Sequence, residues 1–243
     1  MPHPSLSVII PAYNESATLE EIIGRVRATG LVNELIVVDD GSSDDTPAIL
    51  ARLAGSAPPP LRIRRHTRNQ GKGAAIQTGL TAVTGDVVLV QDADLEYDPA
   101  DYPALLAPFE NPGVKVVYGS RNLRHNPQSS FLYYWGGRML SVATNWLFGS
   151  HITDEATGYK IIETSLLRDL QLEKPGFEFC SEVTAKLLRQ GIPIHEVPIS
   201  YRPRTRSEGK KIRWTDGFIA IQTLLRYRLA GRFERRSRPR NHL

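Results

Sequence analysis

The sequence is poor in cysteine and contains no long apolar run, and each shortage excludes a class of protein. Cys180 is the only cysteine among 243 residues, so an internal disulfide framework is excluded and a reducing compartment is expected. Runs of about 18 or more apolar residues are absent, and we therefore expect no helix that spans a bilayer. Residues 1–4 lead directly into the first predicted strand, so we expect no signal peptide.

Basic side chains are scarce in most of the chain and concentrated near its end. Residues 1–201 contain 17 Lys and Arg against 23 Asp and Glu, whereas residues 202–243 contain 13 against 3. Such a basic segment points to a phosphate group, an anionic membrane or a nucleic acid as a partner. The plain alternative is a solvated tail, which we favour for residues 235–243.

The first half of the chain alternates predicted strands with predicted helices. Hydrophobic residues make up 41% of the sequence, enough for the core of one large α/β domain. We expect strands at residues 6–10, 35–38, 61–64, 86–90 and 114–118, and helices at residues 17–28, 46–53 and 72–83. This alternation predicts a mostly parallel central sheet with helices on both faces. In such a sheet, ligands bind at the carboxyl ends of the strands.

The second half is predicted to be mainly helical. We expect helices at residues 130–148, 178–189 and 214–229, and a strand at residues 192–197. The aromatic-rich helix at residues 130–148 is either a core helix or a surface helix that contacts an apolar substrate or a membrane. Glu178 and Glu182 are four positions apart and share one helix face, which points into a cleft or, as we prefer, lies on the surface.

Two aspartates one residue apart, Asp92 and Asp94, follow the apolar strand at residues 86–90. Like charges this close repel each other, and neither carboxylate is removed from water cheaply. A hard divalent cation such as Mg²⁺ or Mn²⁺ removes both problems, since it prefers carboxylate oxygens and keeps positions open for phosphate. The plain alternative is a polar loop with two solvated acids. Polar residues after the neighbouring strands favour the metal site.

Two further loops carry residues suited to a phosphorylated ligand. Asp39 and Asp40 follow the second strand, where one carboxylate is suited to a nucleobase N–H and the other to holding a neighbouring loop. Ordinary turn and helix-start chemistry is the alternative there. Lys72 follows Gly71 at a helix start, where a lysine and backbone N–H groups suit phosphate, although a plain helix start is again the alternative.

A basic loop follows the last predicted strand. Its six basic side chains are Arg202, Arg204, Arg206, Lys210, Lys211 and Arg213. A cationic loop of this kind closes over a pyrophosphate and neutralises a departing nucleotide. The alternative is a solvated charged loop, which the neighbouring acidic metal site makes less attractive.

Six short segments occur in an order that resembles a known family. They are residues 11–15, 39–42, 92–94, 119–121, 154–159 and 209–211. Together they resemble the family 2 glycosyltransferases of the GT-A fold, over about residues 5–230. The resemblance is greatest to the dolichol-phosphate mannose synthase group, which includes bacterial polyprenyl-phosphate hexosyltransferases. One such segment has little specificity, whereas six in order are highly specific.

The resemblance implies roles for individual residues on the donor side. The nucleoside pocket would be lined by Pro11, Tyr13, Glu15, Val38 and Asp40, and Ala12 would also contact the nucleotide-sugar. The nucleotide-sugar would also contact Lys72, Asp92, Ala93, Asp94, Arg204, Lys210 and Lys211. A cofactor ion, Mg²⁺ or Mn²⁺, would be held by Asp92, Asp94 and Glu96.

On the acceptor side, the resemblance implies that Arg121 contacts phosphate. Asp154 is the candidate base if the acceptor is a hydroxyl, because a phosphate acceptor is already an anion and needs no deprotonation. Together with Asp92 and Asp94, these two residues are the expected catalytic set.

The implied function is metal-dependent, inverting transfer of a hexose from a nucleotide-sugar, GDP-mannose or UDP-glucose, to a dolichyl or undecaprenyl phosphate. We expect a catalytic GT-A domain at residues 5–213, with a nucleotide-sugar half at 5–120 and an acceptor half at 121–213. Residues 214–243 would form a basic amphipathic helix and tail. Because the acceptor lies in a bilayer, we expect a peripheral protein at the cytoplasmic face of the membrane.

Other functions are open on sequence grounds. A glycosyltransferase of this family could use a soluble acceptor, such as a phosphorylated small molecule or a saccharide hydroxyl. From other classes come a nucleic-acid-binding protein that uses the basic end and a non-catalytic scaffold. We expect no nucleic-acid partner, because that reading leaves the acidic loops unexplained. The sequence indicates no oligomeric state.

Overall fold

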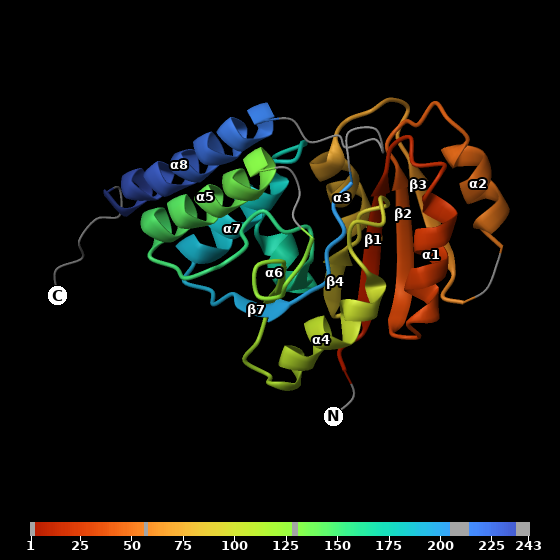
Figure 1. Ribbon diagram of the computed structural model, residues 1–243, viewed down its shortest axis with the longest axis horizontal. Helices are drawn as coiled ribbons and strands as arrows, with labels where there is room; N and C mark the ends of the chain where they lie inside the picture. The colour runs from red at the N-terminus through yellow and green to blue at the C-terminus, as the bar shows by residue number, and fades with distance from the viewer. Residues whose placement is uncertain (1–2, 56–57, 128–130, 205–213, 237–243) are drawn as a thin grey trace.

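A seven-stranded sheet forms the centre of the computed structural model, which describes residues 3–55, 58–127, 131–204 and 214–236 (Figure 1). The strands are β1 (Leu6–Ala12), β2 (Val32–Asp39), β3 (Leu61–Arg65), β4 (Val87–Val90), β5 (Val116–Ser120), β6 (Lys160–Glu163) and β7 (His195–Pro198). Their order is β3-β2-β1-β4-β6-β5-β7. β6 runs antiparallel to both neighbours, and the other pairs are parallel. The mostly parallel sheet is confirmed, and β6 is a strand that the sequence analysis did not predict.

Helices cover both faces of this sheet, as predicted. They are α1 (Leu19–Ala28), α2 (Thr46–Leu53), α3 (Lys72–Leu80), α4 (Tyr102–Leu106), α5 (Phe131–Phe148), α6 (Thr164–Asp169), α7 (Phe179–Arg189) and α8 (Trp214–Arg236), with short 3₁₀ turns at Pro99–Asp101 and Ala107–Glu110. Side chains of α1, α2 and α4 share one hydrophobic core with the sheet, and those of α3, α6 and α7 share the other. α1 shows the principle, since its buried side chains recur at the spacing of one helix face.

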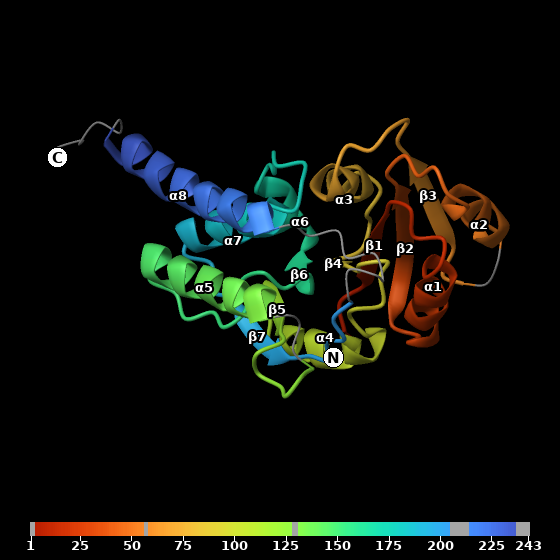
Figure 2. The ribbon, with the colours of Figure 1, turned by 45° about the horizontal axis from the view of Figure 1, so that its top comes forward.

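α5, α7 and α8 form a helical group at the end of the molecule opposite α2 (Figure 1 and Figure 2). Leu140 of α5, Ala185 of α7 and Leu224 of α8 are buried against one another. Both α5 and α8 therefore pack on the domain with one face and keep another face exposed. No helix within the described ranges is long and apolar enough to cross a membrane.

Glu182 on α7 is fully buried, so the expectation that its helix face lies on the surface is wrong. Its carboxylate accepts hydrogen bonds from the backbone N–H groups of Glu173 at 2.9 Å and Lys174 at 2.8 Å. It also accepts a hydrogen bond from the Tyr227 hydroxyl at 2.6 Å and pairs with Lys186 at 2.8 Å. The charge is tolerated because these donors converge on it from α7, α8 and the segment before α7. Helix spacing alone gives no sign of donors that arrive from elsewhere in the chain.

Candidate functional site

The carboxyl ends of β1, β2 and β4 meet at one edge of the sheet, because these strands are parallel neighbours. Ala12 of β1 pairs with Asp39 of β2, and Ile9 of β1 pairs with Val90 of β4. The polar segments that follow the three strands therefore lie together, as predicted for a ligand site of an α/β sheet.

Asp92 and Asp94 lie in the segment after β4, and each is paired with a cation. Asp92 forms an ion pair with the ammonium group of Lys72, from the first turn of α3. Oδ2 of Asp94 is 2.9 Å from Nη2 of Arg204, and the same guanidinium is 3.3 Å from Oε2 of Glu15. The structure thus brings Glu15, Lys72 and Arg204 to the acidic pair. Two other predicted phosphate ligands, residues 210 and 211, lie outside the described residues.

Glu96 holds the segment that leads to Arg204. Its Oε1 accepts a hydrogen bond from the Arg204 N–H at 2.7 Å, and its Oε2 accepts one from the Tyr201 hydroxyl at 2.9 Å. Its backbone carbonyl accepts a third from the Arg202 N–H at 2.9 Å. These contacts give Glu96 a structural task, and its part in metal binding stays a prediction.

The charge balance around Asp94 favours an added cation. Burial raises the pKa of Asp94 to about 7, and the carboxylates of Asp92 and Glu96 act in the same direction, whereas Arg204 lowers it. A divalent cation stabilises carboxylates whose ionisation is opposed in this way.

The donor set also fits the hard cations Mg²⁺ and Mn²⁺, because it consists of oxygen ligands. Among the described residues, no group of three or more His, Cys, Asp or Glu side chains could hold a metal ion by itself. That arrangement suits a cation that is bound by one or two carboxylates and takes its other ligands from the phosphates of a substrate.

Asp40 holds the loop between β3 and α3. Its carboxylate accepts hydrogen bonds from the backbone N–H groups of Gln70 and Gly71, each at 2.8 Å, and lies 2.6 Å from Nδ1 of His66. The other ring nitrogen of His66 is 2.8 Å from the Thr78 hydroxyl on α3. Asp40 was one of the predicted nucleoside contacts, and its oxygens are engaged with the protein.

Asp39 is the better candidate for contact with a nucleobase. Its Oδ1 accepts a hydrogen bond from the Ser42 N–H at 2.9 Å. Its Oδ2 accepts no hydrogen bond, although it is buried and lies 3.1 Å from Nε of the exposed Arg65. Ser42 and Arg65 line a cavity of about 350 Å³ together with Gly41, His66 and Thr67. Asp39 contacts two of these lining residues, Ser42 and Arg65, and a base N–H that reached its Oδ2 would give this oxygen a hydrogen-bond partner.

Three residues predicted to contact the donor have side chains in the hydrophobic cores. Ala12, Val38 and Ala93 are at most 3% exposed. Side chains alternate between the two faces of a strand, so a residue at a strand end can be adjacent to a ligand while its side chain points into the core. These residues can contact a donor only through their backbone. The Tyr13 side chain, by contrast, is exposed beyond the end of β1.

Backbone N–H groups at the start of α3 are used within the protein. Those of Gln70 and Gly71 donate to Asp40, and that of Ala74 donates to the carbonyl of Pro175 at 3.0 Å. A Cβ atom at Gly71 would collide with the same carbonyl. These three N–H groups are therefore already engaged within the protein, and the phosphate contact of the Lys72 ammonium group stays a prediction.

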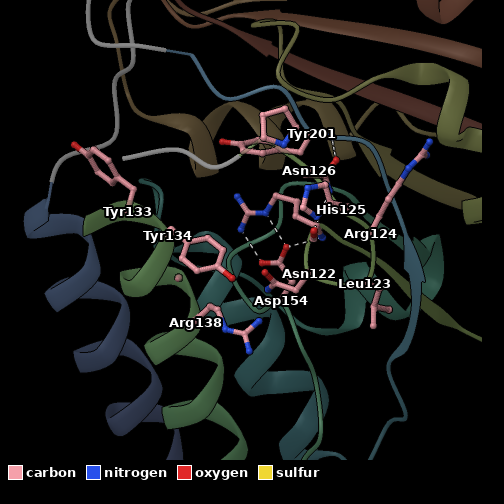
Figure 3. A pocket seen from close by; sticks show the side chains of 13 residues that line it. Asn122, Leu123, Arg124, His125, Asn126, Tyr133, Tyr134, Arg138, Asp154 and Tyr201 are labelled. Atoms are coloured by element: carbon pink, nitrogen blue, oxygen red, sulfur yellow. Dashed lines mark hydrogen bonds and ion pairs between the residues drawn. The ribbon is translucent and has the colours of Figure 1, made fainter. Parts of the chain in front are cut away.

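A second cavity, of about 420 Å³, lies between residues 121–127 and the first turns of α5 (Figure 3). Its lining is basic and aromatic, and includes Arg121, Arg124, His125, Tyr133, Tyr134, Arg138 and Tyr201. Among the described residues that line the cavity, Asp154 is the one with a carboxylate, and it is 1% exposed. The cavity is therefore suited to an anion, with aromatic surface beside it.

Arg121 is held at this cavity by Asp154. Its Nε and Nη2 are 2.7 Å and 2.6 Å from the two carboxylate oxygens, and its backbone N–H donates to the same group at 2.9 Å. Burial opposes ionisation of Asp154, but the Arg121 guanidinium holds the pKa of that carboxyl below its usual value. A carboxylate of this kind is a weak base. Its contacts favour a positioning role, and the predicted base role stays a prediction.

Three tyrosines to which the sequence analysis gave no role connect the acidic segment after β4 with Arg121. The Tyr97 ring stacks on Tyr159 with centroids 4.7 Å apart and contacts Tyr201 at 5.3 Å. Arg121 lies over the ring of Tyr201 at 5.0 Å, and the Tyr97 hydroxyl accepts a hydrogen bond from Gly158. The sequence did contain a signal, since each of these tyrosines directly adjoins or belongs to a segment already linked to the site.

Comparison with known proteins identifies the family. Residues 7–170 match the family described as glycosyl transferase family 2. The chain is 30% identical to the undecaprenyl-phosphate mannosyltransferase of Micrococcus luteus, over 93% of this chain and 95% of that protein. It is also 30% identical to the dolichol-phosphate mannosyltransferase of Pyrococcus furiosus, over 84% of this chain, but it spans only 58% of that protein.

Among solved structures, the chain is similar to glucosyl-3-phosphoglycerate synthase from Mycobacterium tuberculosis in complex with Mn²⁺, UDP and glucosyl-3-phosphoglycerate. The TM-score is 0.71 at 25% identity, and the match covers 92% of this chain and 80% of that one. The motif order, the sheet topology and these similarities agree, and the chain belongs to glycosyl transferase family 2 and has the GT-A fold.

Proposed function

We propose that the protein transfers a hexose from a nucleotide-sugar to a polyprenyl phosphate at a membrane surface, with the help of Mg²⁺ or Mn²⁺. The observation that carries this proposal is the pairing of two sites on one sheet edge. One is acidic and suited to a metal and a diphosphate, and the other is basic and suited to a phosphate acceptor beside apolar surface.

The donor would lie between Asp39 and the acidic pair. Asp39 would accept a hydrogen bond from a nucleobase N–H, and Asp92 and Asp94 would hold the metal. When bound, the metal would supply positive charge that stabilises the leaving diphosphate. Lys72 and Arg204 already lie on these two carboxylates, so both cations are within reach of the phosphates that the metal would bind. The similar structure of glucosyl-3-phosphoglycerate synthase, which contains UDP and Mn²⁺, supports this donor class.

The acceptor phosphate would bind in the cavity beside Arg121. In the transfer, an oxygen of this phosphate forms a bond to the anomeric carbon, while the bond from that carbon to the diphosphate oxygen breaks and the nucleoside diphosphate leaves with the electron pair. No proton needs to be removed, because the acceptor is an anion. The chain's contribution is to align the two anions and neutralise them, through Arg121 on one and Lys72 and Arg204 on the other.

The exposed face of α5 and α8 would lie on the bilayer that contains the acceptor. Met139, Val142 and Trp146 form a stripe along α5, and Trp146 is 84% exposed. Ile221, Leu225 and Leu229 form a second stripe on α8, which packs beside α5. Arg226 and Arg228 of α8 are exposed near this stripe. Apolar stripes flanked by cations are typical of helices that lie in the interface of an anionic membrane.

Vesicle flotation tests the membrane part. The protein should float with vesicles that contain anionic lipid at low salt, and the variant Met139→Glu/Trp146→Glu should stay at the bottom of the gradient. Ala51→Glu, which adds charge on exposed α2 at the far end of the molecule, should float like the wild type. Wild-type protein that remains at the bottom would refute the membrane location.

A soluble phosphorylated acceptor is the second candidate. The similarity to glucosyl-3-phosphoglycerate synthase favours it, and the basic cavity would also suit a small phosphorylated acid. Radiolabelled GDP-mannose or UDP-glucose, supplied with undecaprenyl phosphate or 3-phosphoglycerate, separates the two candidates. Label that moves into the organic phase supports the lipid acceptor, and label in a new aqueous product supports the soluble one. Asp92→Ala should abolish transfer in either case.

A further inference from the structure

Arg204 contacts three of the carboxylates at the acidic site. Its guanidinium contacts Asp94 at 2.9 Å and Glu15 at 3.3 Å, while its backbone N–H donates to Glu96 at 2.7 Å. The side chain is 15% exposed, so the ion pair with Asp94 is largely removed from water. Arginine keeps its charge at all relevant pH values, and a cation that needs this oxygen of Asp94 must therefore displace the guanidinium.

The described side chains of the cluster carry an excess of negative charge. Four carboxylates, those of Glu15, Asp92, Asp94 and Glu96, adjoin two basic side chains, Lys72 and Arg204. When all six are ionised, the excess equals the charge of one divalent cation. The site therefore attracts such a cation electrostatically, but one of its carboxylates, that of Asp94, is already paired with the Arg204 guanidinium.

Lys72 and Arg204 are held at the site by different backbone contacts. The start of α3, which carries Lys72, is fixed by the bond from Ala74 to Pro175 and by close packing at Gly71. The guanidinium of Arg204 contacts Asp94 and Glu15, and its backbone N–H donates to Glu96, so a rotation of the side chain that breaks the contact with Asp94 would leave the backbone hydrogen bond in place. Its backbone anchor would keep it beside the site after that rotation.

We propose that Arg204 is an exchangeable counter-ion of the metal site. In the free protein its guanidinium holds Asp94, and when metal and nucleotide bind together it moves from that carboxylate to the donor diphosphate. The proposal rests on the proposed function, because it takes the donor to be a nucleotide diphosphate held through a metal. The consequence is coupled binding: the metal alone binds weakly, and the metal with its nucleotide binds well, because only then does the displaced arginine gain a new anion.

Mn²⁺ binding measured by electron paramagnetic resonance tests this exchange without any activity assay, since free Mn²⁺ gives the signal and bound Mn²⁺ loses it. Without nucleotide, Arg204→Gln should bind Mn²⁺ roughly tenfold more tightly than the wild type, as expected for removal of one charged hydrogen-bonding competitor. With saturating UDP or GDP, the advantage should disappear or reverse. Arg204→Lys keeps the charge but not the forked geometry, and it should fall between the two.

Arg202→Gln is the matched control. It removes the same charge two positions earlier, and the Arg202 side chain is exposed while its backbone N–H keeps the bond to Glu96. Its Mn²⁺ affinity should change by less than about twofold, because exposed charges are screened by solvent and salt. Circular dichroism melts would show that all three variants fold.

The outcomes separate this proposal from the proposed function. Unchanged or weaker Mn²⁺ binding by Arg204→Gln without nucleotide overturns the exchange, and so does equal tightening in Arg202→Gln, which would indicate a plain effect of net charge. If nucleotide-dependent Mn²⁺ binding is present in the wild type in those cases, the proposed function survives. Absence of Mn²⁺ binding in every variant, with and without nucleotide, overturns both.

Discussion

Replacing the buried Glu182 by glutamine should destabilise the protein, although the side chain is far from any proposed chemistry. Its carboxylate receives hydrogen bonds from two backbone N–H groups, at Glu173 and Lys174, and from the Tyr227 hydroxyl, and it pairs with Lys186. Every one of these partners is a donor. Glutamine has one acceptor oxygen in place of two. Its NH₂ group, which is a hydrogen-bond donor, would lie against another donor.

The size of the effect follows from these contacts. Hydrogen bonds to a charged group contribute roughly 1.5–3 kcal/mol each, and a buried donor without a partner costs about 1–3 kcal/mol. Because glutamine keeps part of the network, we expect Glu182→Gln to lower the free energy of unfolding by about 2–3 kcal/mol at pH 7. Glu178→Gln, at the N-cap position of the same helix, is the matched control. Glu178 is only partly buried and caps no N–H group with its side chain, so its loss should cost about 0.5 kcal/mol or less.

Urea unfolding followed by circular dichroism measures both variants. Burial of Glu182 opposes ionisation, but hydrogen bonds from Lys186 and Tyr227 bring its pKa below the usual 4.5. A pKa that is lower in the folded state stabilises the protein above the unfolded value, and this stabilisation is lost as the pH falls through the folded value. The difference between wild type and Glu182→Gln should therefore be full at pH 7 and shrink below pH 4.5. Equal stability of Glu182→Gln and Glu178→Gln at pH 7 would refute the reasoning.

Three further perturbations test the site and its supports. Burial opposes ionisation of Asp44, but hydrogen bonds from Thr46 and Ser16 lower its pKa to about 2. Asp44→Asn should therefore lower the free energy of unfolding by about 1 kcal/mol at pH 7. This difference should vanish as the pH of the unfolding measurement approaches about 2. Gly73→Ala would place a Cβ against the carbonyl of Lys174, so calorimetry should show a loss of about 1–3 kcal/mol in stability. Asp39→Asn should weaken binding of UDP or GDP, measured by titration calorimetry with Mn²⁺, by about tenfold, and an unchanged Kd would remove Asp39 from the base contact.

The mostly parallel character of the sheet was predictable from sequence, because its parallel strands are short apolar runs and several are separated by helices with a clear buried face. β6 was missed for a physical reason. Residues 160–163 begin with Lys160, whose side chain is buried under the Tyr118 ring and bonded to the carbonyls of Glu155 and Thr157. A lysine in a four-residue strand gives no apolar pattern, and only the folded environment makes its burial acceptable.

The site was predictable as a set of segments but less so as individual contacts. The segments after β1, β2 and β4 had to meet because parallel neighbouring strands end at one edge. Which carboxylate faces a ligand and which holds a loop depends on donors that come from elsewhere. The Asp40 carboxylate accepts hydrogen bonds from Gln70 and Gly71, and that of Asp154 accepts one from Arg121. The sequence around each aspartate gives no indication of these partners.

The acidic and basic sites are joined by structure that would keep their reactants aligned. Tyr97 directly follows residues 92–96, the predicted metal loop, and its ring contacts both Tyr159 and Tyr201. The Tyr201 ring in turn contacts Arg121, and its hydroxyl donates a hydrogen bond to Glu96. The rate of a displacement between two anionic reactants increases most when both are held in position before the reaction. Unbound, the two anions would repel each other and would rarely be oriented for the transfer. Packed aromatic rings give such rigidity without adding charge. Under the proposed function, the spacing between the metal loop and Arg121 is therefore set by these tyrosines, and the chemistry is carried out by the charged groups on either side of them.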